Sequence, residues 1–388
     1  MTSPDHDTRN TGPLSGLRVV EIAGIGPSPF AAMLLADLGA DVLRVDRKGA
    51  ERIVPARYDL LNRNRRNIAL DLKHPRGLET ALQLAERADV LLEGFRPGVA
   101  ERLGLGPDAC LERNSRLVYG RMTGWGQDGP LAHSAGHDIT YVALTGAPHS
   151  IGRADGPPQI PLNLVGDFGG GSLYLAFGVL AALWERGRSG QGQVVDAAVV
   201  DGAVCLTTLV HAMSAAGLWS EERGTNRHDS GTPYYDVYET SDGGWMAVGA
   251  LELQFYAELV QLLQLDGDPA LPDRDDRSRW PELRTRFTER FRSRTREEWT
   301  RTFEGTDACV APVLTPGEAP AHPHLAERTA FTELDGVLQP SPAPRFSRTA
   351  ARLTRHPAAV GEHTREALMN WGIDNVDSLL DSGAAHQA

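Results

Sequence analysis

Cysteine is scarce in this chain, with three in 388 residues, at Cys110, Cys205 and Cys309. They form no CxxC pair, and no histidine joins them at the spacing of a zinc site. The sequence therefore offers neither a disulfide framework nor a zinc motif, and we expect no metal site. Three separated thiols are typical of a protein kept reduced in the cytoplasm, which is the location that we predict.

Positive charge is scarce relative to negative charge. Lysine and arginine number 39 against 51 aspartates and glutamates, so the formal net charge is −12. A broad basic surface for nucleic acid is thereby excluded. No uninterrupted apolar run reaches the roughly 18 residues of a membrane-spanning helix, so we expect no membrane span. The polar residues 1–15 are expected to form a flexible tail.

Short apolar runs alternate with helical patterns over the first 200 residues. Leu17–Ile22 and Asp41–Asp46 have the composition of β-strands, and Ala31–Leu38 between them has helical spacing. The alternation continues with a helix predicted over 78–87 and strands predicted over 90–95 and 116–122. This order predicts an α/β fold with a Rossmann-like parallel sheet covered by helices.

The second half of the chain changes in character. The apolar run Ser172–Trp184 predicts a buried helix, and 191–201 predicts a strand that leads into another helix. A hairpin pattern around Ser241–Gly244 and amphipathic helices over 253–263 and 280–292 predict a smaller α+β domain. The expected organisation is a tail (1–15), a large Rossmann-like domain (16–200), linker helices (201–234), a small domain (235–315), a linker (316–345) and a helical C-terminal return to the large domain (346–388, with one helix over 364–380).

The loop after the first predicted strand contains Gly24 and Gly26, as in dinucleotide-binding folds. Pro29 replaces the third glycine of a GxGxxG motif, which normally allows close packing of helix and strand. Asp46 stands where a ribose-binding acid would be, but Arg47 follows at once and favours a phosphate group. We therefore favour a Rossmann-like scaffold with another ligand, and hydride transfer with NAD(P) is the weakest hypothesis.

Three residues have side chains suited to acid–base chemistry. His137 lies in a glycine-rich loop region, Asp167 precedes the long apolar helix, and Glu252 follows a predicted strand of the small domain. Taken singly, Asp167 is explained as a helix N-cap and His137 as a structural histidine. Alternatively, the free N–H groups at the start of that helix let a ligand oxygen approach the backbone. Spacing alone leaves both interpretations open.

Long motifs extend over residues 12–350: GPLSGLRVVEIAGIGP, LLADLGADVLRVDR, EGFRPGV, RMTGWGQDGP, AGHDITY, NLVGDFGGG and PYYDVYETSDGGWMAVGALE. In these motifs the chain resembles the CaiB/BaiF family, the family III CoA transferases, and within it the α-methylacyl-CoA racemases. The resemblance implies that His137 and Asp167 form an acid–base pair and that Glu252 supports His137. It also implies an interlocked homodimer in which Glu252 reaches the site from the partner subunit.

The resemblance further implies a set of residues that contact coenzyme A, although any one of its arginines could equally be an ordinary surface charge. These residues are Arg47, Leu70, Asp71, Leu72, Lys73, Gly94, Phe95, Arg96, Arg102, Gly136, Asp138, Ile139, Thr140 and Tyr141.

The chemistry that we favour is racemisation of a 2-methylacyl-CoA through an enolate, a reaction of lipid metabolism. His137 would act on one face of the α-carbon and Asp167 on the other, while backbone N–H groups at the start of the Asp167 helix hold the enolate oxygen. No cofactor is expected beyond the coenzyme A of the substrate. The alternative is CoA transfer with Asp167 as nucleophile. It is disfavoured because the transferases lack the histidine of AGHD and have a glycine-rich loop in place of GALELQ. A non-catalytic acyl-CoA-binding protein is the third hypothesis, and the acyl chain is not identified.

Overall fold

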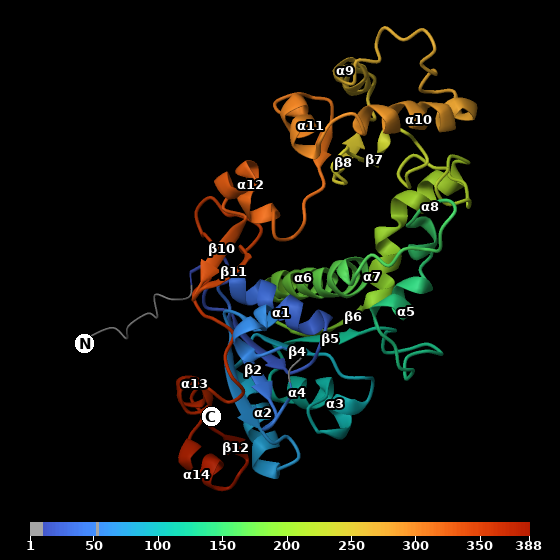
Figure 1. Cartoon of the computed structure of the whole chain (residues 1–388). Helices are drawn as coiled ribbons and strands as arrows, with labels where there is room; N and C mark the ends of the chain where they lie inside the picture. The colour runs from blue at the N-terminus through green and yellow to red at the C-terminus, as the bar shows by residue number, and fades with distance from the viewer. Residues whose placement is uncertain (1–10, 52–53) are drawn as a thin grey trace. The chain divides into compact units, whose positions relative to one another are not determined.

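The computed structural model describes residues 11–51 and 54–388 (Figure 1). The first ten residues of the predicted tail lie outside this range. The chain forms two compact units. Unit 1 contains the chain up to Thr145 together with Leu162–Leu206 and His324–Ala388, and unit 2 contains Gly146–Pro161 and Thr207–Pro323.

Unit 1 is built on a seven-stranded sheet in the order β12-β3-β2-β1-β4-β5-β6. Its strands are β1 (Arg18–Ile22), β2 (Asp41–Asp46), β3 (Arg66–Leu70), β4 (Val90–Glu93), β5 (Val118–Thr123), β6 (Gln193–Ala198) and β12 (Ala385–His386). All pair in parallel except β12, which is antiparallel to β3. Without β12 the order is 3-2-1-4-5-6, as in dinucleotide-binding folds. The predicted Rossmann-like sheet is confirmed.

Helices cover both faces of this sheet because successive strand residues point to opposite sides. In β1, Val19 packs in a core with α1 (Pro27–Asp37) and α6 (Leu173–Ser189), which lie alongside each other in Figure 1. Val20 packs in the opposite core with α2 (Pro75–Arg87) and α13 (Thr364–Asn370). The remaining α-helices that lie within unit 1 are α3 (Val99–Arg102), α4 (Pro107–Arg113), α5 (Asp138–Ala143), α7 (Val199–Leu206) and α14 (Val376–Asp381).

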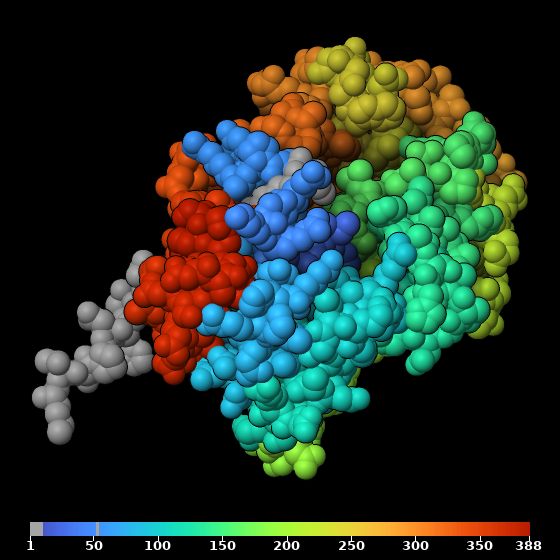
Figure 2. Space-filling model, turned by 90° about the horizontal axis from the view of Figure 1, so that it is seen from below, coloured from blue at the N-terminus to red at the C-terminus, as the bar shows by residue number. Residues whose placement is uncertain are grey.

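The C-terminal segment belongs to unit 1, and Figure 2 shows it (red) against the N-terminal part of the chain (blue). The hydroxyl of Thr364 accepts a hydrogen bond from the amide of Ala69 at 3.1 Å, and β12 pairs with the same strand. The single helix predicted over 364–380 is wrong. It divides into α13 and α14, because Gly372 and Asn375 have φ angles of 75° and 57°.

Two further predictions need correction. The linker predicted over 316–345 contains α12 (Pro323–Glu327) and an antiparallel hairpin of β10 (Phe331–Leu334) and β11 (Val337–Pro340). The helix predicted to be buried over 172–184 corresponds to α6, which is buried on one side only. Leu175 and Val179 are fully buried, whereas Phe177 and Trp184 are 73% and 75% exposed.

Among the residues that the structure describes, one helical segment, Leu164–Ser189, is long and apolar enough to cross a membrane, by length and composition only. The expectation concerned uninterrupted apolar runs, and this segment is interrupted by Asp167 and Glu185. The same segment supplies core residues of unit 1, and a core helix passes the same test.

Unit 2 contains a three-stranded antiparallel sheet of β7 (Tyr235–Glu239), β8 (Trp245–Gly249) and β9 (Val310–Pro312). Its core combines residues of this sheet with α9 (Leu253–Leu262), α10 (Trp280–Phe291) and α11 (Arg296–Phe303). Helix α8 (Thr208–Ala215) belongs to the same unit. The predicted smaller α+β domain with its hairpin is confirmed.

Candidate active site

The strand order of unit 1 reverses between β1 and β4, and ligands of open α/β sheets bind at the carboxyl ends of such strands. The loops that follow these two strands line two cavities, of about 600 Å³ and about 710 Å³. Ile25 from the first loop and Phe95 from the second line both cavities. We refer to them as the reaction cavity (600 Å³) and the cofactor cavity (710 Å³).

His137 and Asp167 both line the reaction cavity. His137 is the N-cap residue of α5, and its backbone is fixed by Thr140, whose hydroxyl accepts a hydrogen bond from the His137 amide at 3.0 Å. The side chain is exposed. The structure therefore brings together the two residues that the sequence could only place in separate segments.

Asp167 lies within a π-helical segment, η4 (Leu164–Ser172), that continues directly into α6. Such segments are rare and often occur at functional sites. The helix begins three residues before Asp167, so the interpretation of Asp167 as its N-cap is wrong. Its amide is not free either, because it donates to Oδ1 of Asp138 at 2.7 Å. The expectation that backbone N–H groups at the start of this helix hold the enolate oxygen stays a prediction, and the Asp167 amide itself is engaged with Asp138.

Glycines at Gly170 and Gly202 explain why η4 lies where it does. A Cβ atom on Gly202 would overlap the carbonyl oxygen of Gly170, and a Cβ on Gly170 would lie 2.6 Å from the amide nitrogen of Ala203. The backbones of η4 and α7 therefore pass in direct contact. At Gly170 the glycine run of GDFGGG serves helix packing, which sets the position of Asp167.

The carboxyl group of Asp167 has a raised pKa. Burial raises its pKa to about 6, the negative charge of Asp138 acts in the same direction, and His137 opposes the shift. Burial also raises the pKa of Asp138, while the Asp167 amide counteracts this. A carboxyl group with a pKa near operating pH can both release and accept a proton.

Aromatic side chains fix the wall of the reaction cavity around the GHD loop. The ring of Tyr141 packs edge-on against Trp125 at 4.8 Å, and its hydroxyl donates to the carbonyl of Gly136. A Cβ atom on Gly124 or Gly136 would overlap the Tyr141 ring. Sequence reasoning assigned no role to Trp125 or Gly124, although both belong to the conspicuous GWG motif.

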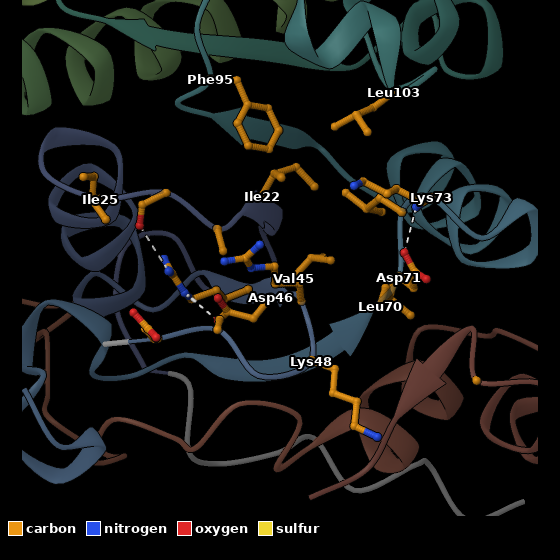
Figure 3. Close-up of a pocket in the computed structure, with 18 residues that line it drawn as sticks. Ile22, Ile25, Val45, Asp46, Lys48, Leu70, Asp71, Lys73, Phe95 and Leu103 are labelled. Carbon is orange, nitrogen blue, oxygen red and sulfur yellow. Dashed lines mark hydrogen bonds and ion pairs between the residues drawn. The ribbon is translucent and has the colours of Figure 1, made fainter. Parts of the chain in front are cut away.

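The predicted coenzyme A contacts divide between the two cavities. The cofactor cavity is lined by Arg47, Leu70, Asp71, Leu72, Lys73 and Phe95, and the reaction cavity by Gly94, Phe95, Arg96, Gly136, Asp138 and Tyr141. Ile139, Thr140 and Arg102 line neither; all three are exposed. Figure 3 shows the cofactor cavity with Phe95 and Leu103 on one side and Leu70 and Val45 on the other.

Cationic side chains border the cofactor cavity. Arg47, Lys48 and Lys73 are exposed, and all three line it. Lys48 was not assigned a role from the sequence, although it follows Arg47 directly. Arginine and lysine are the side chains that usually bind phosphate groups. Glu51 and Asp71 line the same cavity, so its exposed border combines three cations that can bind phosphate with two carboxylates.

Beneath the cofactor cavity, Asp46 takes part in a buried network. Its carboxylate accepts a hydrogen bond from Arg44 Nε at 2.9 Å and from Asn67 Nδ2 at 2.6 Å. Arg44 also donates to the carbonyl of Gly24 at 3.2 Å, which anchors the glycine loop. The carboxylate is therefore engaged within the protein, which argues against a ribose-binding role and against the NAD(P) hypothesis.

Glu252 lies in unit 2, where it is the exposed N-cap residue of α9, three residues after the end of β8. Arg274 fixes this junction by donating to the carbonyl of Leu251 at 2.7 Å. Because His137 belongs to unit 1, the support of His137 by Glu252 stays a prediction. Over the described parts of the chain, no group of three or more His, Cys, Asp or Glu residues is placed to hold a metal ion.

A doubly wound sheet with His137 and Asp167 in one cavity at its switch point, beside a second cavity bordered by Arg47, Lys48 and Lys73, defines the class as an α/β protein with a ligand site at the carboxyl ends of its strands. The model of CoA-transferase family III matches residues 14–364, and the chain belongs to this family.

Two relatives share most of their length with the chain. The alpha-methylacyl-CoA racemase of Mus musculus is 45% identical, covering 94% of this chain and 95% of the relative. The enzyme of the same name from Homo sapiens is 44% identical, with 95% and 98% covered. A crystal structure of a CaiB/BaiF family protein from Brucella suis has a TM-score of 0.81 at 24% identity, covers 93% of this chain and 100% of that chain, and supports the fold.

Proposed function

We propose that this chain is a racemase that interconverts the (R) and (S) forms of 2-methylacyl-CoA thioesters. The observation that carries the proposal is that His137 and Asp167 line one cavity while the pKa of Asp167 is raised to about 6. The names of the two mammalian relatives support the same reaction.

The reaction needs a proton carrier on each face of the α-carbon. In one direction neutral His137 removes the α-proton, the C–H electron pair moves into the enolate, and protonated Asp167 delivers its proton to the opposite face. In the reverse direction ionised Asp167 removes the proton and imidazolium His137 returns one. Both directions use an enzyme form that carries one proton on the pair, so a bell-shaped dependence of kcat/KM on pH is expected.

The coenzyme A portion of the substrate is assigned to the cofactor cavity. Arg47, Lys48 and Lys73 at its border would bind the phosphates. The thioester would then pass the wall formed by Ile25 and Phe95 to reach the reaction cavity. The proposed chemistry needs no cofactor beyond the coenzyme A of the substrate.

CoA transfer with Asp167 as nucleophile is the alternative within the same family. A transferase requires no second proton carrier across the cavity from the carboxylate. The presence of His137 in the same cavity as Asp167 therefore favours proton transfer.

Incubation of one pure enantiomer of a 2-methylacyl-CoA in deuterated water separates these functions. A racemase incorporates deuterium at the α-carbon and inverts the centre. A transferase moves CoA to an added carboxylate and leaves the centre unchanged, whereas a binding protein does neither. His137→Ala and Asp167→Ala should each lose about a hundredfold or more of the rate of inversion while folding normally. Wild-type rates in both variants would overturn the residue assignment.

We further propose that the protein forms a homodimer through the exposed side of α6. Four apolar side chains at helical spacing form this seam: Leu173, Phe177, Leu180 and Trp184, which are 52%, 73%, 36% and 75% exposed. Exposed apolar stripes of this kind mark sites of association. A homodimer would also allow Glu252 of one subunit to reach His137 of the other.

A further inference from the structure

The side chains of Asp138 and Ser172 both form hydrogen bonds with the Asp167 backbone, and that of Asp138 holds its amide. The Oδ1 atom of Asp138 accepts the hydrogen bond from the Asp167 amide at 2.7 Å, linking the start of α5 to η4. A Cβ atom on Gly166 would overlap the same oxygen, so a glycine is required beside the contact. The hydrogen bond between the Asp167 amide and Asp138 therefore holds the two residues side by side, and it can form only if position 166 is a glycine.

The surroundings of Asp167 show which charges act on it. From α5 it is faced by His137, Asp138 and Tyr141, and Tyr141 is in turn influenced by Arg96 from the loop after β4. From the loop before α1 it is approached by Gly26, where a Cβ would lie 3.3 Å from Asp167 Oδ2. Asp138 is the negatively charged group among these neighbours.

We propose that Asp138 is a positioning residue for Asp167: its carboxylate holds the Asp167 amide and places a second negative charge beside the proton-carrying carboxyl. This inference rests on the proposed function. It differs from the role expected from the family resemblance, in which Asp138 contacts coenzyme A. Loss of the charge should therefore alter the pH at which the site titrates, whereas loss of a coenzyme A contact should alter substrate affinity.

The matched pair Asp138→Asn and Asp138→Ala separates charge from hydrogen bonding. The asparagine variant can still accept the Asp167 amide but carries no charge, so Asp167 should ionise at lower pH. We expect the acidic limb of the kcat/KM profile to move down by about half a pH unit or more, with KM little changed. The alanine variant also loses the oxygen that accepts the Asp167 amide, and its kcat should be about tenfold lower than that of the asparagine variant.

Asp138→Glu retains the charge and serves as the control, with the acidic limb expected near its wild-type position. An unchanged limb in Asp138→Asn would overturn the proposal. So would a rise of about tenfold in KM with kcat and the limb unchanged, because that result indicates a coenzyme A contact.

A second measurement covers the case in which the asparagine variant does not fold. In wild-type protein labelled with carbon-13 at the aspartate carboxyls, Asp138 and Asp167 should titrate as a coupled pair with two steps. Independent single-step titrations would contradict the inference. This measurement needs no turnover, so it remains decisive even if the deuterium experiment disproves the racemase function.

Discussion

At Asp167 the carboxyl group is withdrawn from water, placed beside a second acid and opposed by an imidazole. Burial and the charge of Asp138 both favour its protonated form, so the ionised carboxylate is unfavourable for the stability of the fold, as the proposed role in proton transfer requires. This conflict between chemistry and stability is common at catalytic sites.

Replacement of Asp167 by asparagine should stabilise the protein at neutral pH. The folded pKa of about 6 exceeds the ordinary value of 3.8, so the stability that this group contributes is complete below about pH 4 and is lost as pH rises through 6. At pH 7 we expect Asp167→Asn to gain about 1–2 kcal/mol, allowing for partial solvent access.

Chemical denaturation of both proteins at pH 7 and pH 4 measures this gain. The advantage of Asp167→Asn should shrink toward zero at the lower pH. An equal difference in unfolding free energy at both pH values would show that the pKa of Asp167 is not raised in the folded state.

Removal of one proton carrier should leave exchange that depends on the enantiomer. In His137→Gln, Asp167 can still remove the α-proton from the enantiomer that presents it and return a deuteron to the same face. In Asp167→Asn the opposite enantiomer should exchange. Chiral chromatography with mass spectrometry would show label without inversion in each case, and equal labelling of both enantiomers in either variant would contradict the assignment to opposite faces.

At the scale of elements, the contact between α5 and η4 depends on a residue without a side chain. Gly166→Ala should push Asp138 away from the Asp167 amide, because the new Cβ overlaps Oδ1. We expect a loss of about 1–3 kcal/mol in unfolding free energy and of most activity. The control is Gly187→Ala in α6, where a Cβ meets nothing within 4 Å and helix propensity should add about 0.5–1 kcal/mol. Calorimetry of the two variants tests both expectations, and a harmless Gly166→Ala would contradict the role of this contact.

Predictions from sequence succeeded for elements with regular apolar patterns and failed where polar residues are buried. Asp41–Asp46 was predicted with its observed bounds. Strand β3 (Arg66–Leu70) was missed, since Arg66 and Asn67 look like surface residues; in the structure they pair with Asp41 and Asp46. These partners are distant in sequence, so no local pattern indicates them.

The candidate site was likewise predictable from the sequence only in part. The residue types of His137 and Asp167 and the family motifs were visible in the sequence, but their shared cavity depends on two glycine-mediated contacts, between η4 and α7 and between η4 and α5. The π-helical form of η4 was not predictable either, because GDFGGG resembles a loop when its packing partner is unknown.

At the scale of the whole molecule, the exposed seam of α6 makes association testable. Trp184→Glu places a charge at the most exposed position of the seam and should convert the proposed dimer to monomers, with loss of activity if Glu252 comes from the partner. Light scattering after size-exclusion chromatography measures the mass. Met369→Glu, at another exposed apolar residue on α13, is the control and should leave it unchanged. A Trp184→Glu protein that remains dimeric would exclude this surface.

The short strand β12 near the end of the chain protects one edge of the main sheet. Strand β12 pairs with β3 and so covers an edge of the main sheet that would otherwise present unpaired backbone groups. Trimming the final four residues should therefore promote sheet-to-sheet aggregation on storage. For the same reason, affinity tags and fluorescent fusions are better attached at the N-terminus, where they do not disturb the pairing of β12 with β3.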